Sequence, residues 1–225
     1  MDGNRRYGER KFGDVGSARK LEGHSEGGRK LGDVIEWCME SGVRELTCFA
    51  FSTENWNREQ NEVDMLMRTF ISRCEEIGRT ARERGVRVVV LSSDTSRIPA
   101  HVSEALDKLV RETALHSTMT LNLAVSYGAR GELANAARGL AVRVRAGTLD
   151  PEQIDEASFE SELLLSSAPD LLLRTSGEFR LSNFLLWQLA YTELVFVDQF
   201  WPELTRLDFD GVLDEFARRK RRYGK

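Results

Sequence analysis

The chain has 225 residues, of which 41% are hydrophobic, and this is enough for one sizeable core. Lysine and arginine number 32 against 36 aspartate and glutamate residues, and the net charge of −4 argues against a protein that binds nucleic acid through bulk positive charge. The sequence holds no apolar run of about 18 residues and no signal-peptide segment after Met1, so we expect a cytoplasmic protein that neither spans a membrane nor is secreted.

Five short apolar runs have the length and the β-branched or aromatic content of strands, and longer stretches with helical spacing lie between them. This alternation predicts an α/β fold with a mainly parallel central sheet flanked by helices. No linker rich in proline, glycine or serine divides the chain, so residues 1–225 are expected to form a single domain. The predicted strands are 46–51, 86–91, 121–125, 171–173 and 194–197.

Apolar residues at helical spacing predict helices that bury one face against this sheet. Gly42 and Gly85 follow the first two helices and are suited to cap their carboxyl ends. Residues 5–22 are polar and weakly periodic, which favours a loop or a mobile helix. The predicted helices are 32–41, 63–77, 99–115, 130–146, 158–166, 182–191 and 209–222.

Polar side chains follow three of the predicted strands, and ligands of open parallel sheets bind beyond the carboxyl ends of the strands. Residues 52–58, 126–128 and 174–183 are therefore expected to meet at one rim. In the third segment, Arg174, Arg180 and Ser182 are suited to hold a diphosphate, because guanidinium groups match phosphate oxygens. The alternative reading of these residues alone is a solvated loop that Ser182 caps.

Four other features have both a functional and a structural interpretation. Residues 2–6, Asp-Gly-Asn-Arg-Arg, combine a carboxylate and cations that suit a Mg²⁺-diphosphate, or they form a charged terminus without a ligand. His24 lies beside glycines and either approaches a phosphate or packs as a structural histidine. Glu193 needs a metal or a cation as partner. The basic residues 218–222 either end a helix in solvent or reach an anionic site or membrane surface.

In order along the chain, these motifs resemble the cis-prenyltransferase family, which includes bacterial undecaprenyl diphosphate synthase and eukaryotic dehydrodolichyl diphosphate synthase. The resemblance implies condensation of isopentenyl diphosphate onto an allylic diphosphate such as farnesyl diphosphate, with Mg²⁺ as cofactor, to give a cis-polyprenyl diphosphate for glycosyl-carrier lipids. It also implies a hydrophobic tunnel, a homodimer and peripheral contact with a membrane. The matching segments are 1–7, 23–24, 50–58, 62–63, 174–187, 190–193, 201–202 and 222–224.

The resemblance further assigns roles to single residues. Asp2 and Glu193 match carboxylates linked to Mg²⁺, and the residue that matches Asp2 is essential for catalysis. Ser52, Asn55 and Trp56 match positions near the reacting carbons. Arg174, Arg180 and Ser182 match residues that grip isopentenyl diphosphate, while Arg222 and Gly224 match a motif that reaches the neighbouring subunit's site. Residues matching positions that hold the allylic diphosphate are Gly3, Asn4, Arg6, His24 and Arg58. Tyr7, Lys20 and Trp56 match further substrate-binding positions, with Lys20 in place of an arginine.

The resemblance leaves two alternatives to an enzyme and one structural expectation. The first alternative is a non-catalytic partner subunit of a heteromeric cis-prenyltransferase, and the second is a plain isoprenoid-lipid binding protein. The intact Asp-Gly-Asn and Ser-x-Glu-Asn-Trp motifs favour the enzyme. Because family members carry a strand before the Asp-Gly-Asn motif, we expect the central sheet of this chain to lack that strand.

Overall fold

The structure is a computed structural model that describes residues 17–219, with side chains from residue 27 onward. Within this range, three parallel strands pair in the order β1 (Glu45–Ser52), β3 (Met119–Tyr127), β2 (Val86–Leu91). A second parallel pair joins β4 (Leu171–Arg174) to β5 (Glu193–Phe196). The five predicted strands are thus confirmed within two residues at each end, and so is their parallel pairing.

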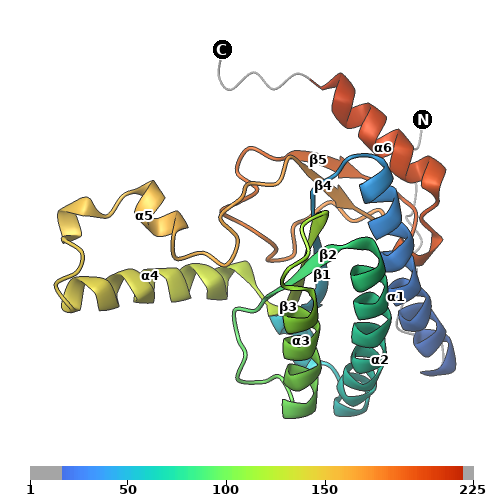
Figure 1. The fold of residues 1–225 in the computed structure, drawn as a ribbon, viewed down its shortest axis with the longest axis horizontal. Helices are drawn as coiled ribbons and strands as arrows, with labels where there is room; N and C mark the ends of the chain where they lie inside the picture. The colour runs from blue at the N-terminus through green and yellow to red at the C-terminus, as the bar shows by residue number, and fades with distance from the viewer. Residues whose placement is uncertain (1–16, 220–225) are drawn as a thin grey trace, which may run out of the picture.

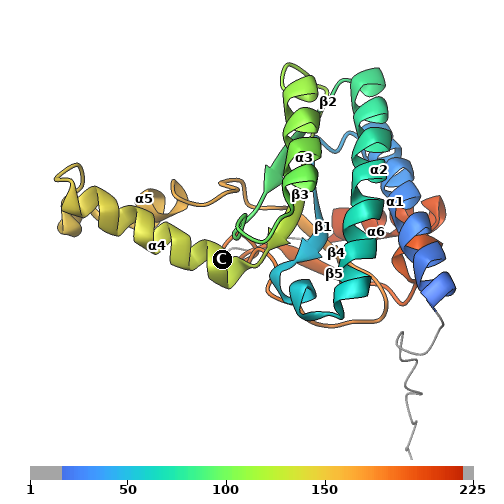
Figure 2. The ribbon, with the colours of Figure 1, turned by 90° about the horizontal axis from the view of Figure 1, so that it is seen from below.

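Helices cover these sheets and extend beyond them. Figure 1 shows α2 and α3 side by side in front of the central sheet, with α1 next to α2 and α6 near β5. Figures 1 and 2 both show α4 and α5 as an arm that projects from the body. No helix within residues 17–219 has the length and apolar character needed to cross a membrane. The helices are α1 (Ser17–Glu40), α2 (Gln60–Arg84), α3 (Ala100–Thr113), α4 (Ala129–Arg145), α5 (Glu156–Glu160) and α6 (Arg206–Arg218).

The central strand β3 separates two apolar cores, because alternate residues of a strand point to opposite faces of the sheet. Leu121, Leu123 and Val125 belong to the core under α1, α2 and α3. Ala124 belongs to a second core with residues of the 181–189 segment, and Tyr127 joins this core because the positive φ of Ser126 and the register shift there interrupt the alternation. The predicted amphipathic helices therefore pack as expected. Gly42 and Gly85 end α1 and α2 with φ of 75° and 70°, which confirms their predicted capping positions.

The predicted helix over 182–191 is wrong. This segment forms a series of turns, in which Ser182, Asn183 and Leu185 have φ of 52°, 63° and 42°. Left-handed backbone cannot continue a right-handed helix, so apolar residues at helical spacing here serve a folded loop. Several other boundaries differ from prediction. The helix α1 begins at Ser17, inside the segment expected to be a loop or a mobile helix, α2 extends to Arg84 beyond the predicted residue 77, and α5 has only 5 residues.

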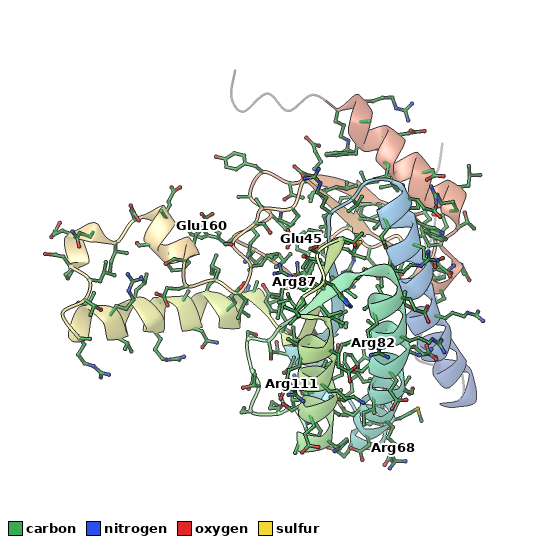
Figure 3. All side chains as sticks on the ribbon, viewed as in Figure 1. Glu45, Arg68, Arg82, Arg87, Arg111 and Glu160 are labelled. Carbon is green, nitrogen blue, oxygen red and sulfur yellow. The ribbon has the colours of Figure 1, made fainter. Side chains whose placement is uncertain are left out.

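A cavity of about 2350 Å³ lies between the two sheets and is lined by residues of β1 and β4 together with α1, α2 and α6. Both strands are edges among the described residues, since β1 pairs with β3 alone and β4 with β5 alone. Glu45 at the start of β1 accepts a hydrogen bond from Ser167 Oγ at 3.0 Å, close before β4 (Figure 3).

Candidate active site

The segment directly after β1 is a short 3-10 helix, η1 (Thr53–Asn57), held by reciprocal side-chain hydrogen bonds. Ser52 Oγ accepts from the Asn55 backbone N–H at 3.3 Å, and Asn55 Oδ1 accepts from the Ser52 backbone N–H at 2.9 Å. This capping box fixes both side chains at the carboxyl end of β1. The register of the β1–β3 pair shifts around Ala50, and such an irregularity bends β1 just before η1 begins. Ser52 and Asn55, which together with Asp2 are the predicted catalytic residues, therefore lie in direct contact.

Trp56 of η1 is oriented by the central strand. Its indole Nε1–H donates to Ser126 Oγ at 2.8 Å, and its ring meets the Phe51 ring edge-on with centroids 4.7 Å apart. Ser126 is fully buried with φ of 49°, a conformation rarely adopted outside glycine and asparagine. The guanidinium carbon of Arg97 lies over the indole, 5.4 Å from the centroid of the ring. The carboxyl ends of β1 and β3 thus meet at one rim, as the sequence predicts.

A second hydrogen bond crosses this rim from η1 to the loop after β4. Asn183 Nδ2 donates to Glu54 Oε1 at 2.8 Å. Partial burial raises the pKa of the Glu54 carboxyl, but hydrogen bonds from Asn183, Thr53 and the backbone favour the carboxylate more strongly, so the pKa lies below its ordinary value. Glu54 is therefore a charged acceptor at neutral pH.

The loop after β4 gathers cations. Arg174 ends β4 and donates from Nη2 to Ser182 Oγ at 3.4 Å, while Arg180 forms an ion pair with Glu178. Burial and the nearby positive charge of Arg180 lower the pKa of Arg174, although Glu178 acts in the opposite direction. Two guanidinium groups held this close repel each other, so an anion between them would lower the energy of the site. The structure brings together the three residues that the sequence predicts for one diphosphate.

The backbone of this loop is hydrogen-bonded to the segment after β5. Ser176 and Gly177 have φ of 70° and 61°, and their N–H groups donate to the carbonyls of Gln199 and Val197 at 2.8 and 2.9 Å. A Cβ on Gly177 would lie 3.2 Å from Asp198 Oδ1, so glycine suits both the conformation and the space. These contacts fix the backbone of the loop between Arg174 and Arg180.

Arg58 adds a third cation to the mouth of the large cavity. It follows η1 and forms an ion pair with Glu62 of α2 at 2.9 Å, a partly exposed pair with little cost of opening. Arg58, Arg174 and Arg180 all line the cavity at the carboxyl end of the sheets. Apolar side chains of α1 and α2 line it farther in, namely Leu31, Val34, Leu66 and Phe70. A cationic rim thus surrounds the entrance to an apolar interior.

Glu193, the predicted metal ligand, lies away from this rim. It begins β5 opposite Leu171, whereas Arg174 lies at the other end of the same strand pair. Its carboxylate accepts from Arg219 Nη1 at 3.0 Å, and Arg219 also donates to the Leu194 carbonyl. Within the part of the chain that the structure describes, no three His, Cys, Asp or Glu side chains gather as a metal site. The metal role of Glu193 stays a prediction.

Several predicted site residues fall where the structure gives no side chains. Lys20 and His24 lie in the first half of α1, whose backbone alone is described. The remaining ones lie outside the described residues, and they are Asp2, Gly3, Asn4, Arg6, Tyr7, Arg222 and Gly224. The assignment of the allylic side therefore rests here on Trp56, Arg58 and the Ser52–Asn55 pair.

The structure also adds residues to which sequence reasoning gave no role. Glu54, Ser126, Gly128 and Asn183 connect the segments that carry the predicted site residues. Each stands directly after a strand or beside a predicted substrate residue, and this position was the only available signal. Their partners lie 70 and 129 positions away along the chain, so only the folded structure reveals them.

The chain is similar over its whole length to known proteins. A prenyltransferase family model, described as undecaprenyl diphosphate synthase, matches residues 1–224. The ditrans,polycis-undecaprenyl-diphosphate synthase ((2E,6E)-farnesyl-diphosphate specific) of Xanthomonas axonopodis pv. citri is 45% identical, with 100% of this chain and 86% of that protein covered. The tritrans,polycis-undecaprenyl-diphosphate synthase (geranylgeranyl-diphosphate specific) of Thermococcus kodakarensis is 41% identical, with 100% and 84% covered.

The fold is likewise similar to a solved structure. Lavandulyl diphosphate synthase from Lavandula x intermedia, solved in complex with dimethylallyl diphosphate, superposes with a TM-score of 0.87 and 33% identity. The match covers 92% of this chain and 92% of that one. The overall fold is therefore shared with a protein of known structure.

Proposed function

Because the chain belongs to the undecaprenyl diphosphate synthase family of prenyl-transferring enzymes, we propose that it condenses isopentenyl diphosphate with farnesyl diphosphate or a similar allylic diphosphate. The resemblance seen in the motifs is confirmed, and the chain is a cis-prenyltransferase. The observation that carries the substrate proposal is the rim of Arg58, Arg174 and Arg180 at the mouth of an apolar cavity. Such a site suits a molecule with an anionic head and a long apolar tail.

The proposed reaction uses two diphosphates at this rim. Arg174, Arg180 and Ser182 hold isopentenyl diphosphate, while Arg58 and the η1 segment lie toward the allylic substrate. The allylic carbon–oxygen bond breaks, a carbon–carbon bond forms to isopentenyl diphosphate, which loses a proton, and pyrophosphate leaves. Negative charge grows on the leaving diphosphate as this bond breaks, so fixed arginines stabilise the transition state more than the ground state.

The growing product needs an apolar compartment. Leu66 and Phe70 of α2 belong to a stripe that both packs on the core and faces the cavity. We assign the hydrophobic tunnel to this space between α1, α2 and β1. Ser52, Asn55 and Trp56 stand where the cationic rim meets the apolar wall, so they are placed to orient the reacting carbons.

Mg²⁺ belongs to the proposal through diphosphate oxygens and Asp2. The described carboxylates do not form a complete site of their own, and Glu193 is engaged by Arg219. When bound, Mg²⁺ would neutralise diphosphate charge and favour departure of pyrophosphate. The binding roles of Arg174, Arg180 and Ser182 do not depend on it.

A homodimer through the arm is also part of the proposal. Apolar side chains on α4, on the segment around α5 and on the 181–192 turns are exposed, and these are Val142, Ile154, Leu164, Leu186 and Tyr191. Glu160 of the arm accepts a hydrogen bond from Trp187 Nε1 at 3.2 Å, and Phe159 packs on the Trp187 ring (Figure 3). A projecting arm with exposed apolar residues is suited to a second copy of the chain.

The test is incorporation of labelled isopentenyl diphosphate into lipid-extractable product. Farnesyl and geranylgeranyl diphosphate are compared as primers, because relatives of this chain are specific for one or the other. We expect Mg²⁺-dependent elongation that EDTA abolishes, with product length read by chromatography. A folded protein that makes no product with either primer would contradict the catalytic proposal and favour the partner-subunit alternative.

A further inference from the structure

Asn183 connects three separate segments of the site. Its side-chain Nδ2 donates to Glu54 Oε1 at 2.8 Å, and its Oδ1 accepts from the Arg130 backbone N–H at 2.8 Å. Its main-chain carbonyl accepts from the Ala129 N–H, also at 2.8 Å. One residue thus ties η1 and the first turn of α4 to the loop that carries Ser182. Because Arg130 N–H fixes the amide oxygen, the amide nitrogen necessarily faces Glu54.

Gly128 lies directly beneath this connection. A Cβ on Gly128 would come within 2.5 Å of Thr53 Oγ1 and 2.6 Å of Asn183 Nδ2. Its φ of −154° is extended backbone that any residue adopts, so glycine is required here by space and not by conformation. The two loops can approach each other only because residue 128 has no side chain.

The backbone of the loop depends on the same residue. Ser182 and Asn183 have φ of 52° and 63°, and asparagine tolerates this left-handed region better than other residues with a Cβ. Asn183 directly follows Ser182, which contacts Arg174. Glu54 directly precedes Asn55, which is locked to Ser52. A hydrogen bond between residues 54 and 183 therefore sets the distance between the two halves of the rim.

We propose that Glu54 and Asn183 form a positioning clamp, closed over Gly128, which holds the isopentenyl diphosphate loop in register with the segment of Ser52, Asn55 and Trp56. Neither residue touches the reacting atoms in this proposal. It rests on the proposed assignment of Arg174, Arg180 and Ser182 to isopentenyl diphosphate. Small displacements of reacting groups cost large factors in rate, so a clamp of this kind would act on kinetic constants more than on stability.

The sharpest test exchanges donor and acceptor across the clamp. Asn183→Asp keeps the size, the left-handed tolerance and the acceptor for Arg130, but it places a carboxylate against Glu54. Adding Glu54→Gln restores a hydrogen bond with the opposite polarity and returns the net charge to its original value. Both changes are nearly isosteric, so neither creates a cavity. Gln153→Glu, at an exposed residue of the arm whose side chain still accepts from the Asp150 N–H, is the control for the added charge.

We expect Asn183→Asp to lower kcat/KM for isopentenyl diphosphate about tenfold, with a smaller effect on the KM of the allylic diphosphate. The double variant should recover to within about threefold of the original enzyme, because opposite partners again face each other. Gln153→Glu should leave the kinetic constants for both substrates unaffected. Unchanged kinetics in Asn183→Asp, or a double variant as impaired as the single one, would overturn the clamp.

Gly128→Ala keeps the proposal testable if Asn183→Asp does not fold. It separates Thr53 and Asn183 by steric pressure alone, and we expect the same selective loss for isopentenyl diphosphate in protein with an unchanged circular dichroism spectrum. Equal loss for both substrates, or none, would count against the clamp. An original enzyme without any activity would instead refute the proposed function, so the two failures are distinguishable.

Discussion

The most informative stability test concerns a buried hydrogen bond that joins the arm to the body. Tyr127 at the end of β3 is fully buried and donates its hydroxyl to Glu132 Oε2 at 2.6 Å. Glu132 of α4 is 2% exposed and also accepts from the Leu164 backbone N–H and from Gln188 Nε2. None of these three partners is a cation, so three neutral hydrogen-bond donors stabilise the buried carboxylate. Tyr127→Phe removes one of them and leaves the ring in place.

The magnitude follows from the geometry. A short hydrogen bond to a charged group contributes about 1.5–3 kcal/mol to stability, and burial prevents water from replacing the lost donor. For a chain of this size, such a loss lowers Tm by about 3–12 °C. Removal of a hydroxyl at a solvated surface position has an expected effect within about 0.5 kcal/mol, so a larger loss reports the buried hydrogen bond.

The pH dependence separates this hydrogen bond from a mere packing change. Burial, the hydrogen bond to Glu132 and its negative charge raise the pKa of Tyr127 far above the ordinary value of 10.0. The folded state then keeps a proton that the unfolded state loses, so the stability that this group contributes is present below pH 10 and falls as pH rises above it. The difference in unfolding free energy between the original chain and Tyr127→Phe should shrink above pH 10.

Urea unfolding at pH 7 and at several values above pH 10 measures both effects. The cysteine thiols titrate in both proteins, so their contribution cancels in the difference. A loss at pH 7 of no more than about 0.5 kcal/mol, or a difference independent of pH, would refute the reasoning about the Glu132 network.

Two further predictions concern activity. Arg174→Lys should raise the KM for isopentenyl diphosphate about tenfold while Tm changes little, because lysine cannot match two phosphate oxygens at once; an unchanged KM argues against the assignment. Asp2→Ala should abolish turnover in a folded protein, and retained activity in the radiolabel assay contradicts its role.

Much of the fold was predictable because local patterns carry it. The runs 86–91 and 121–125 became neighbouring parallel strands, since short β-branched or buried apolar segments bounded by polar residues have few other ways to pack. The segment 182–191 shows where this reasoning fails. Its apolar residues have helical spacing, yet Phe184 and Leu185 fill the second core from a chain of turns. The contacts of Asn183 with α4 and η1 outweigh the local helical preference.

The sequence by itself determined which segments we expect to bear the chemistry, because Ser52, Asn55, Arg174 and Ser182 belong to motifs that are contiguous along the chain. The tertiary structure alone decided how these segments meet. It placed Glu193 beside Arg219 at the start of β5, away from Arg174, and it joined Glu54 to Asn183 across Gly128. Propensity and periodicity act over a few residues, whereas such contacts depend on which strands become neighbours. That choice depends on burial over the whole domain, so no local pattern contains it.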